Sequence, residues 1–366
     1  MNLTKYLAIH ILREDLCYLA IVAKECSPLL VIEFLQRLHE VFGTYFGQSV
    51  TEASVRENFV IVYQLLDEMM DNGFPFTTEP NSLSEIIPPP NVFRAVVGGI
   101  TGQSNMKADM NTGSMSMHPW RKAGVRHTTN EIYIDIIESI DSTVETNGMA
   151  AHTEVSGEVA VQCKLSGIPD LSLFFSNPHI LDDVSFHPCV RYNRYEQSKV
   201  VSFIPPDGNF KLMNYRVKGQ LQLPIYVKPQ ITFSTNGGRV NVMVGSKTTG
   251  GKVVEDIIIT IPFPKFVTTA TLSANYGTVQ YDDITRIAKW TLSKIPKDKS
   301  PILEGNLSTT AAATMDSNPV VQAEFKIMQY ASSGLKVDTL TLHNESYKPY
   351  KGVRFITKAG KLHFRS

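Results

Sequence analysis

The sequence contains few of the residues that would indicate a metal site, disulfide chemistry or nucleic-acid binding. Its four cysteines, Cys17, Cys26, Cys163 and Cys189, form no CxxC pair and have no histidine cluster nearby. They are therefore interpreted as buried thiols in a reducing compartment, with no disulfide framework and no metal site. Lysine plus arginine equals aspartate plus glutamate at 35 each. The basic excess that nucleic-acid-binding proteins need is missing.

Long apolar segments and the common catalytic motifs are missing from the sequence as well. No apolar run approaches the roughly 20 residues that a membrane-spanning helix requires. The first residues, which include Lys5, Arg13, Glu14 and Asp15, make a poor signal peptide. A GxxxxGK[ST] phosphate loop, an HExxH metal motif and a GxSxG nucleophile elbow do not occur. The sequence therefore predicts a cytosolic protein that is not an enzyme and uses no cofactor.

The amino-terminal residues predict a small α/β unit. Residues 6–13 and 17–24 alternate like two strands of a hairpin, and Ser27-Pro28 is a typical helix start. A second helix is expected to open at Ser54, where Ser-Val-Arg-Glu has the pattern of a capping box. A two-stranded sheet is marginal in water and too small for two amphipathic helices. Residues 1–76 are therefore expected to form an incomplete domain, which lacks strands at its start or obtains them from another chain.

Residues 77–129 are expected to be a connector. Pro88-Pro89-Pro90 is stiff and extended, whereas residues 100–129 are rich in glycine, serine, asparagine and methionine and show no periodicity. Trp120 and the basic residues that follow it, Arg121, Lys122 and Arg126, could be a docking segment, but a solvated linker is the simpler interpretation.

From residue 130 the sequence is typical of an all-β domain. Short alternating strands recur, among them residues 220–227 and 230–234, and Asn236-Gly237-Gly238 is a typical hairpin turn. The spacing predicts an antiparallel β-sandwich over residues 130–366 rather than a parallel α/β sheet. Trp290 is expected to lie in its core.

The first strand of this domain, residues 130–140, carries an unusual polar residue. Ile132 and Ile134 point to one face of the strand, and Tyr133 and Asp135 point to the other. An aspartate within a strand is unfavourable unless another group holds it. The pattern alone favours an exposed edge strand with one solvated carboxylate. The alternative is a site that receives a hydrogen-bond donor from a ligand.

Four segments in this order resemble the mu (medium) chains of the heterotetrameric vesicle-coat adaptor complexes, most of all those of the third adaptor complex. They are residues 131–140, 155–169, 203–213 and 352–360. The resemblance spans nearly the whole chain. It implies a mainly β protein, with a partial longin-like α/β domain over residues 1–76, a flexible linker over 77–129 and a mu-homology domain over 130–366. That last domain would be a two-subdomain antiparallel β-sandwich, and the longin-like sheet would lack the strands that normally precede Met1.

The resemblance also implies a function and a site. The family's carboxyl-terminal domain binds Tyr-x-x-Φ sorting signals, in which Φ is a bulky aliphatic residue, in the cytosolic tails of membrane cargo. The signal binds as an added strand, with one pocket for each of its two side chains. The tyrosine pocket would consist of Tyr133, Asp135, Gln162, Gly352 and Arg354. The aliphatic pocket would consist of Ile132, Ile134, Val337, Leu340, Lys351 and Val353.

Individual roles follow for the tyrosine pocket. Asp135 and Arg354 would hold the phenol by charge-assisted hydrogen bonds, and Tyr133 would stack on its ring. This requires the strands that carry Asp135 and Arg354 to lie side by side. Gln162 stands where the resemblance puts a lysine, and Gly352 where it puts a tryptophan. Weaker tyrosine binding, or a different preference around the tyrosine, is therefore expected.

The partners implied are two large chains and one small chain of a complex, cargo tails, and membranes contacted peripherally at the Golgi, endosomes and transport vesicles, in traffic toward lysosomes. The alternative is a structural or membrane-docking subunit whose signal pocket is weak or unused. It rests on basic residues near the carboxyl terminus that could meet acidic headgroups or form a solvated face. They are Lys348, Lys351, Arg354, Lys358, Lys361 and Arg365.

Overall fold

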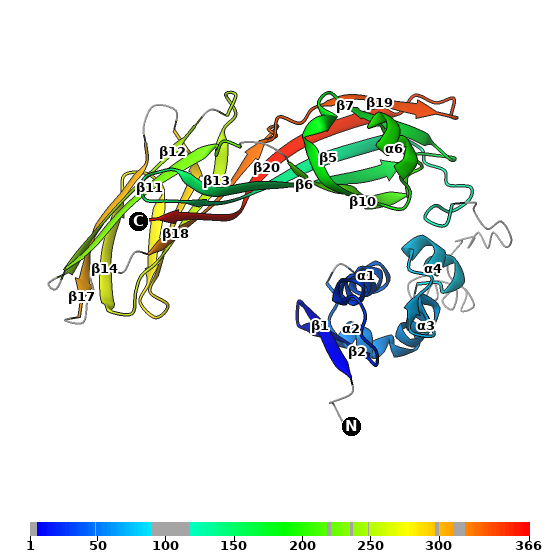
Figure 1. Ribbon diagram of the computed structural model, residues 1–366, viewed down its shortest axis with the longest axis horizontal. Helices are drawn as coiled ribbons and strands as arrows, with labels where there is room; N and C mark the ends of the chain where they lie inside the picture. Colours follow the sequence, from blue (N-terminus) through cyan, green and yellow to red (C-terminus); the bar gives the residue numbers. More distant parts are fainter. Residues whose placement is uncertain are drawn as a thin grey trace, which may run out of the picture. The chain divides into compact units, whose positions relative to one another are not determined.

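The computed structural model divides the chain into two compact units, Met1–Val125 and Arg126–Ser366 (Figure 1). The residues that the structure describes are 6–47, 49–89, 118–217, 221–234, 237–247, 249–296, 300–310 and 319–366. Within these ranges, no helix is both long enough and apolar enough to cross a membrane.

The amino-terminal unit consists of a β-hairpin and a group of helices. The predicted hairpin is confirmed, because β1 (Leu7–Arg13) and β2 (Leu16–Val22) pair antiparallel. The other elements are α1 (Pro28–Phe46), α2 (Glu52–Glu57), α3 (Phe59–Met69), β3 (Met70–Asp71), β4 (Phe74–Pro75) and α4 (Pro80–Ile86). Val41, Leu65 and Leu83 have no exposed surface and belong to one apolar core shared by the helices.

The second predicted helix begins earlier than expected and is interrupted. Thr51, not Ser54, is the N-cap, because the Thr51 hydroxyl accepts a hydrogen bond from the Ser54 N–H at 3.2 Å. Ser54 Oγ accepts in return from the Thr51 N–H at 2.9 Å, which completes the capping box. Asn58 then separates α2 from α3, and its side-chain amide donates to the Ser54 carbonyl at 2.7 Å.

The amino-terminal unit also extends beyond residue 76, where a flexible connector was expected to begin. Leu83 of α4 is fully buried in its core, and the Ile87 carbonyl accepts a hydrogen bond from the buried Tyr45 hydroxyl at 2.8 Å. The expected connector is thus partly folded, because its first residues carry apolar side chains that the core accommodates. Residues 90–117 of the expected connector lie outside the described residues.

The far end of the predicted connector is docked as well. The Asn81 side chain donates to the Trp120 carbonyl, and Ser82 Oγ donates to the Pro119 carbonyl at 2.6 Å. Arg121 is 1% exposed. These residues are therefore packed within the amino-terminal unit, whereas a solvated linker was expected.

The described residues of the carboxyl-terminal unit form three sheets. The largest has the strand order β15-β16-β13-β18-β20-β5-β6-β10-β8. In that order the strands are Thr278–Asp282, Ile287–Lys294, Val254–Pro262, Val320–Met328, Tyr350–Arg365, Glu131–Val144, Ala150–Lys164, Gly208–Val217 and Leu181–Phe186. A four-stranded sheet contains β11 (Ile225–Ser234), β12 (Gly237–Ser246), β17 (Ile302–Thr309) and β14 (Val267–Ala274), and a three-stranded sheet contains β19 (Val337–His343), β7 (Asp170–Phe175) and β9 (Val201–Phe203). The helical segments of this unit are η2 (Pro178–Ile180) and α6 (Tyr192–Ser198).

The unit is a two-part β-sandwich, as predicted. The long strands β5, β6 and β20 run through both parts (Figure 1). In one part they accompany the three-stranded sheet. In the other part the four-stranded sheet closes a core that contains the fully buried Trp290, whose Nε1 donates to the Tyr276 carbonyl at 2.8 Å. Alternate residues of β5 from Ile132 to Val144 are buried, so one face of this strand supplies both cores.

The structure differs from the expected strands in three respects. Residues 225–234 form a single strand, whereas separate strands over residues 220–227 and 230–234 were expected. Because β11 lies at the edge of its sheet, the missing N–H of Pro229 costs no ladder hydrogen bond on the open side. The strand with Asp135 is not an edge strand, since β5 lies between β20 and β6. Its pairing with β20 is parallel, whereas an all-antiparallel sandwich was expected.

Among the described residues, three tyrosines face a glycine on the neighbouring strand, with the ring in the space that a Cβ atom would take. A Cβ added to the glycine would lie 2.0, 2.3 or 2.6 Å from the nearest ring atom. The pairs are Tyr215 with Gly157, Tyr226 with Gly245, and Tyr133 with Gly352. Each glycine thus allows close cross-strand packing of an aromatic ring.

We expect Gly157→Ala to destabilise the carboxyl-terminal unit by about 1–3 kcal/mol, because overpacking a buried site forces neighbouring atoms to move. Tyr215 is only 2% exposed, and its hydroxyl donates to the buried Glu138 at 3.0 Å. Urea unfolding followed by Trp290 fluorescence in a Trp120→Phe background measures the loss. The exposed Ser156→Ala on the same strand is the control, and an unchanged midpoint for Gly157→Ala would contradict the expectation.

Candidate functional site

The parallel pairing of β5 and β20 brings the two halves of the predicted tyrosine pocket together. Gly352 lies opposite Tyr133, and Arg354 lies opposite Asp135. The expectation that these strands lie side by side is confirmed, although 219 residues separate Asp135 from Arg354. The side chains of these residues project from the outer face of the nine-stranded sheet, because Ile132 and Ile134 of β5 point into the core.

Asp135 and Arg354 form a bidentate ion pair. Arg354 Nε donates to Asp135 Oδ1 at 2.7 Å, and Arg354 Nη2 donates to Oδ2 at 2.5 Å. The Asp135 side chain is 23% exposed and that of Arg354 is 54% exposed. The hydrogen bond with Asp135 raises the pKa of the Arg354 guanidinium above its usual value. The aspartate that was unexplained in the strand pattern is therefore held by the arginine of the adjacent strand.

A hollow of about 470 Å³ opens beside this ion pair on the outer face of the sheet. We call it the tyrosine hollow. Of the predicted tyrosine-pocket residues, those that line it are Tyr133, Asp135, Gln162 and Arg354. The sequence analysis did not identify several other lining residues, namely Glu158, Ala160, Asn209 and Lys211. Alternation along β6 could have indicated Glu158 and Ala160, which share a face with Gln162. The β10 residues could not be identified in this way, because their position beside β6 depends on the strand register. That register shifts after Lys211, which the sequence does not reveal.

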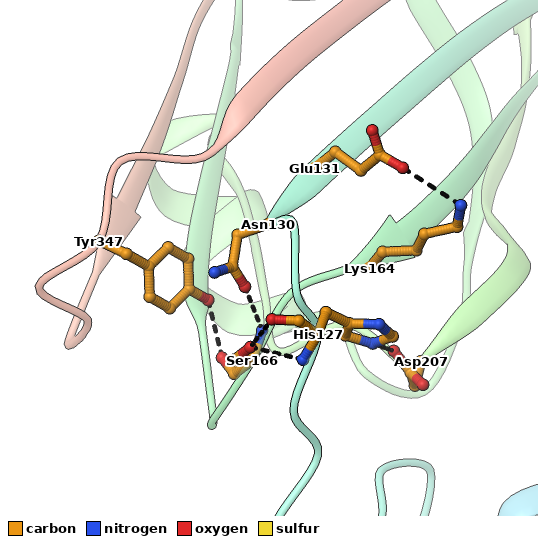
Figure 2. A network of polar contacts seen from close by, with 7 residues as sticks. All are labelled: His127, Asn130, Glu131, Lys164, Ser166, Asp207 and Tyr347. Carbon is orange, nitrogen blue, oxygen red and sulfur yellow. Dashed lines mark hydrogen bonds and ion pairs between the residues drawn. The ribbon is translucent and has the colours of Figure 1, made fainter.

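Tyr133 has a fixed position at the rim of this hollow. Its hydroxyl donates to Glu131 at 3.1 Å, and Glu131 accepts an ion-pair hydrogen bond from Lys164 at 3.1 Å (Figure 2). The ring centroids of Tyr133 and Tyr350 are 5.6 Å apart. The hydrogen bond to Glu131 raises the pKa of Tyr133, while hydrogen bonds from Lys164 and Tyr133 lower the pKa of Glu131.

A polar network connects the ends of the strands that carry the site (Figure 2). Asn130 Oδ1 accepts from the Ser166 N–H at 2.7 Å, and Ser166 Oγ accepts from the His127 N–H at 2.8 Å. His127 Nε2 lies 2.8 Å from Asp207 Oδ1, and the Tyr347 hydroxyl donates to the Ser166 carbonyl at 2.7 Å. These contacts tie the entry to β5 to the end of β6 and to the segments that precede β10 and β20.

The predicted aliphatic pocket lies on the opposite face of β5 and β20. Ile132 and Ile134 have no exposed surface, and Leu340 is 7% exposed. The accessible part is formed by the half-buried Val337 and Val353 and by the stem of Lys351. Lys351 Nζ donates to the Leu340 carbonyl at 2.5 Å, which links β20 to β19 here.

The first residues of β20 leave one edge of the sheet open. Strand β18 pairs with β20 only up to Ile356, and beyond that point the Gln329 N–H donates to the Phe355 carbonyl at 2.7 Å. Because backbone groups alternate in direction along a strand, those of Lys351 and Val353 point to the same side as those of Phe355. Within the described part of the chain, no strand pairs with them there. Between the two predicted pockets the structure therefore offers main-chain donors and acceptors to an added strand.

Within the described ranges, no group of histidine, cysteine, aspartate and glutamate side chains could hold a metal ion. None of the four cysteines forms a disulfide. Cys17 is exposed and Cys26 is half-buried, so the expectation of buried thiols is right only for Cys163 and Cys189.

Two comparisons of sequence families define the class of the protein. Residues 118–366 match the adaptor complexes medium subunit family, and residues 9–87 match the clathrin adaptor complex small chain family. The chain belongs to the adaptor complexes medium subunit family, whose members act in vesicle transport.

Medium subunits of AP-3 complexes are among the relatives of this chain. The chain is 50% identical to AP-3 complex subunit mu of Dictyostelium discoideum, over 99% of this chain and 87% of that protein. It is 46% identical to AP-3 complex subunit mu-1 of Homo sapiens, over 98% of this chain and 87% of that protein.

Solved structures share the fold. A chain in a homology model of the full-length AP-3 complex in an intermediate open conformation matches with a TM-score of 0.61 and 17% identity, covering 99% of this chain and 87% of that chain. The yeast delta-COP-I mu-homology domain matches with a TM-score of 0.51 and 15% identity, covering 65% of this chain and all of that one. At such identities the likeness supports the fold alone.

We expect Glu131→Ala to lower the pKa of Tyr133 toward the ordinary value for tyrosine. The ionised phenol would face the Glu131 carboxylate, so this neighbour favours the neutral, hydrogen-bond-donating form. Titration of ¹³Cζ-labelled tyrosine by NMR measures the shift, with Tyr133→Phe to assign the signal. Lys164→Ala keeps the carboxylate and should keep the pKa of Tyr133 raised. Equal values in wild type and Glu131→Ala would show that another group causes the shift.

Proposed function

We propose that this chain is the cargo-recognising medium subunit of an AP-3-type adaptor complex and binds Tyr-x-x-Φ signals in the cytosolic tails of membrane proteins, without catalysis. It would act on Golgi, endosomal and vesicle membranes in transport toward lysosomes. The observation that carries the proposal is the Asp135–Arg354 pair, which stands between a hollow and an open strand edge.

The chemistry of this pair suits a phenol. A tyrosine hydroxyl can donate to Asp135 and accept from Arg354, and both hydrogen bonds are strengthened by charge. The backbone of the signal would extend the sheet along Lys351 and Val353. Its aliphatic side chain would then reach the opposite face of β20, close to Val337 and Val353. One strand edge thus separates two pockets of different polarity, which is what a signal with two anchoring side chains requires.

The energies suggest weak binding. Burial of the tyrosine and aliphatic side chains contributes roughly 1.5–3 kcal/mol each. Ordering a flexible tail offsets much of this gain. The dissociation constant should therefore be on the order of micromolar or weaker. Stable capture at a membrane would require several simultaneous contacts, as in a multi-subunit coat.

The amino-terminal unit supports assembly with other chains. The hairpin exposes Leu12 at 64% and Leu19 at 56%, and α3 exposes Phe59 at 58% and Tyr63 at 66%. Large apolar side chains gathered on a small unit are typical of an interaction surface. We propose that the other subunits of the complex, two large chains and one small chain, cover these faces.

A membrane-docking subunit with an unused pocket is less well supported. Of the basic residues on which it rests, Arg354 is paired with Asp135 and Arg365 with Glu145, at 3.1 Å. Lys351 donates to a carbonyl group of the protein. These cations are therefore already neutralised or engaged, which reduces their attraction to acidic headgroups.

We expect the full chain to bind a Tyr-x-x-Leu peptide more tightly than its Tyr→Ala version, and Asp135→Ser to remove this difference. The substitution deletes the acceptor for the phenol and leaves Arg354 unpaired, while the aliphatic face stays unchanged. Isothermal titration calorimetry measures both peptides. Asp183→Ser, an exposed acid on β8, is the matched control. Equal affinity of the wild type for both peptides, or tyrosine-dependent binding that survives in Asp135→Ser, would refute the proposal.

We expect the full chain to sediment only weakly with phosphatidylserine vesicles, because several of its carboxyl-terminal cations are paired. Sedimentation at low and high salt measures this binding. Strong binding that falls with salt, as screening requires, and that persists in Asp135→Ser would favour the membrane-docking alternative.

A further inference from the structure

The ring of Tyr133 leans over β20 and leaves the tyrosine hollow open. A Cβ atom added to Gly352 would lie 2.6 Å from Tyr133 Cδ1 and 3.0 Å from Cε1. The ring therefore occupies the space that any larger residue at position 352 would need. Gly352 itself does not line the hollow, whose walls come from β5, β6, β10 and Arg354. The open space of the site thus lies on the β6 side of Tyr133.

Several contacts keep the ring in this position. The Tyr133 hydroxyl is bonded to Glu131, which Lys164 holds in turn. The ring of Tyr350 packs against that of Tyr133 at an interplanar angle of 49°. Two residues therefore hold the ring of Tyr133 in place. Gly352 leaves space for the ring, and the Glu131 carboxylate accepts a hydrogen bond from its hydroxyl.

The floor of the hollow is a small residue. Ala160 of β6 lies opposite Asp135 on one side and opposite Lys211 on the other. It is half-buried and shares the outer face with Gln162. Its methyl group leaves space between two ion pairs. One is Asp135 with Arg354, and in the other Lys211 Nζ lies 2.8 Å from Glu158 Oε2. Any longer side chain at position 160 would fill that space.

We propose, on the basis of the proposed function, that the tyrosine ring of the signal lies over Ala160, between these two ion pairs, and not over β20. Ala160 and Gly352 then determine specificity. Ala160 provides the room for the ring, and Gly352 keeps Tyr133 out of it. The tyrosine position would accept a flat aromatic residue with a hydrogen-bond donor at its tip, since the apolar floor is flanked by carboxylates and cations.

The test uses the full chain and a synthetic Tyr-x-x-Leu peptide, with its Tyr→Ala version to report on the aliphatic pocket alone. Ala160→Leu fills the floor of the hollow. Gly352→Ala forces the ring of Tyr133 off β20 and toward the hollow. Gly245→Ala is the matched control, because it creates the same clash with Tyr226 in the four-stranded sheet, away from the site. A thermal melt of each variant confirms folding.

We expect Ala160→Leu and Gly352→Ala to weaken binding of the tyrosine peptide roughly tenfold or more, the loss that corresponds to one buried side chain. The Tyr→Ala peptide should bind these two variants with the affinity that it has for the wild type. The Gly245→Ala variant should bind both peptides with wild-type affinity. In 3-fluorotyrosine-labelled protein, the ¹⁹F signal of Tyr133, assigned with Tyr133→Phe, should move in Gly352→Ala and stay unchanged in Gly245→Ala.

The outcomes separate this inference from the proposed function. If the wild type does not distinguish the two peptides, the proposed function fails and the inference fails with it. If the wild type does distinguish them but Ala160→Leu binds the tyrosine peptide normally, only the inference is overturned. A Tyr133 ¹⁹F signal that is unchanged in Gly352→Ala, or an equal loss of affinity in Gly245→Ala, would also overturn it.

Discussion

The parallel pairing of β5 with β20 is the constraint on which the carboxyl-terminal unit depends. It joins the first and last strands of the domain in the middle of the nine-stranded sheet. Because each strand is long enough to pass through both parts of the sandwich, this pairing connects the two cores, with one shift of register between Ala359 and Leu362. The Asp135–Arg354 pair lies on this seam, half exposed, where an ion pair contributes little to stability. The proposed function gives this pair a chemical role, which is to bind the phenol of the signal.

The two faces of β5 differ in burial and in polarity. One face is apolar and buried almost throughout, whereas the other is half-exposed and carries Tyr133 and Asp135. The buried face is interrupted by Glu138, at the transition between the two sandwiches. Its carboxylate accepts hydrogen bonds from the Tyr215 hydroxyl at 3.0 Å, the Ser333 N–H at 3.0 Å and the Ser333 hydroxyl. A buried polar group is tolerated when it is fully hydrogen-bonded, and here it anchors the segment that joins β18 to β19.

Cross-strand tyrosine–glycine packing serves structure in one place and function in another. With Gly157, the ring of Tyr215 is buried and helps to satisfy Glu138. With Gly352, the ring of Tyr133 borders an open hollow. The same tyrosine–glycine packing thus fills a buried position beside Glu138 in one place and borders the candidate site in the other. The surroundings of each ring determine whether it is buried or borders an open hollow.

Local patterns in the sequence determined the local features of this protein. The hairpin of residues 7–22, the helix that starts at Pro28 and the two-faced strand around Asp135 follow from periodicity, capping and alternation, which act over a few residues. The tyrosine-pocket residues came from resemblance to a family, and four of them line one hollow. Tertiary structure alone decided that β5 is central and not an edge, because the partner of a strand is chosen by packing over hundreds of residues. It also decided that Ala160 and Lys211 share the hollow and that Tyr133 leans over Gly352, since strand register and the space beside a missing Cβ exist only once the sheet has formed.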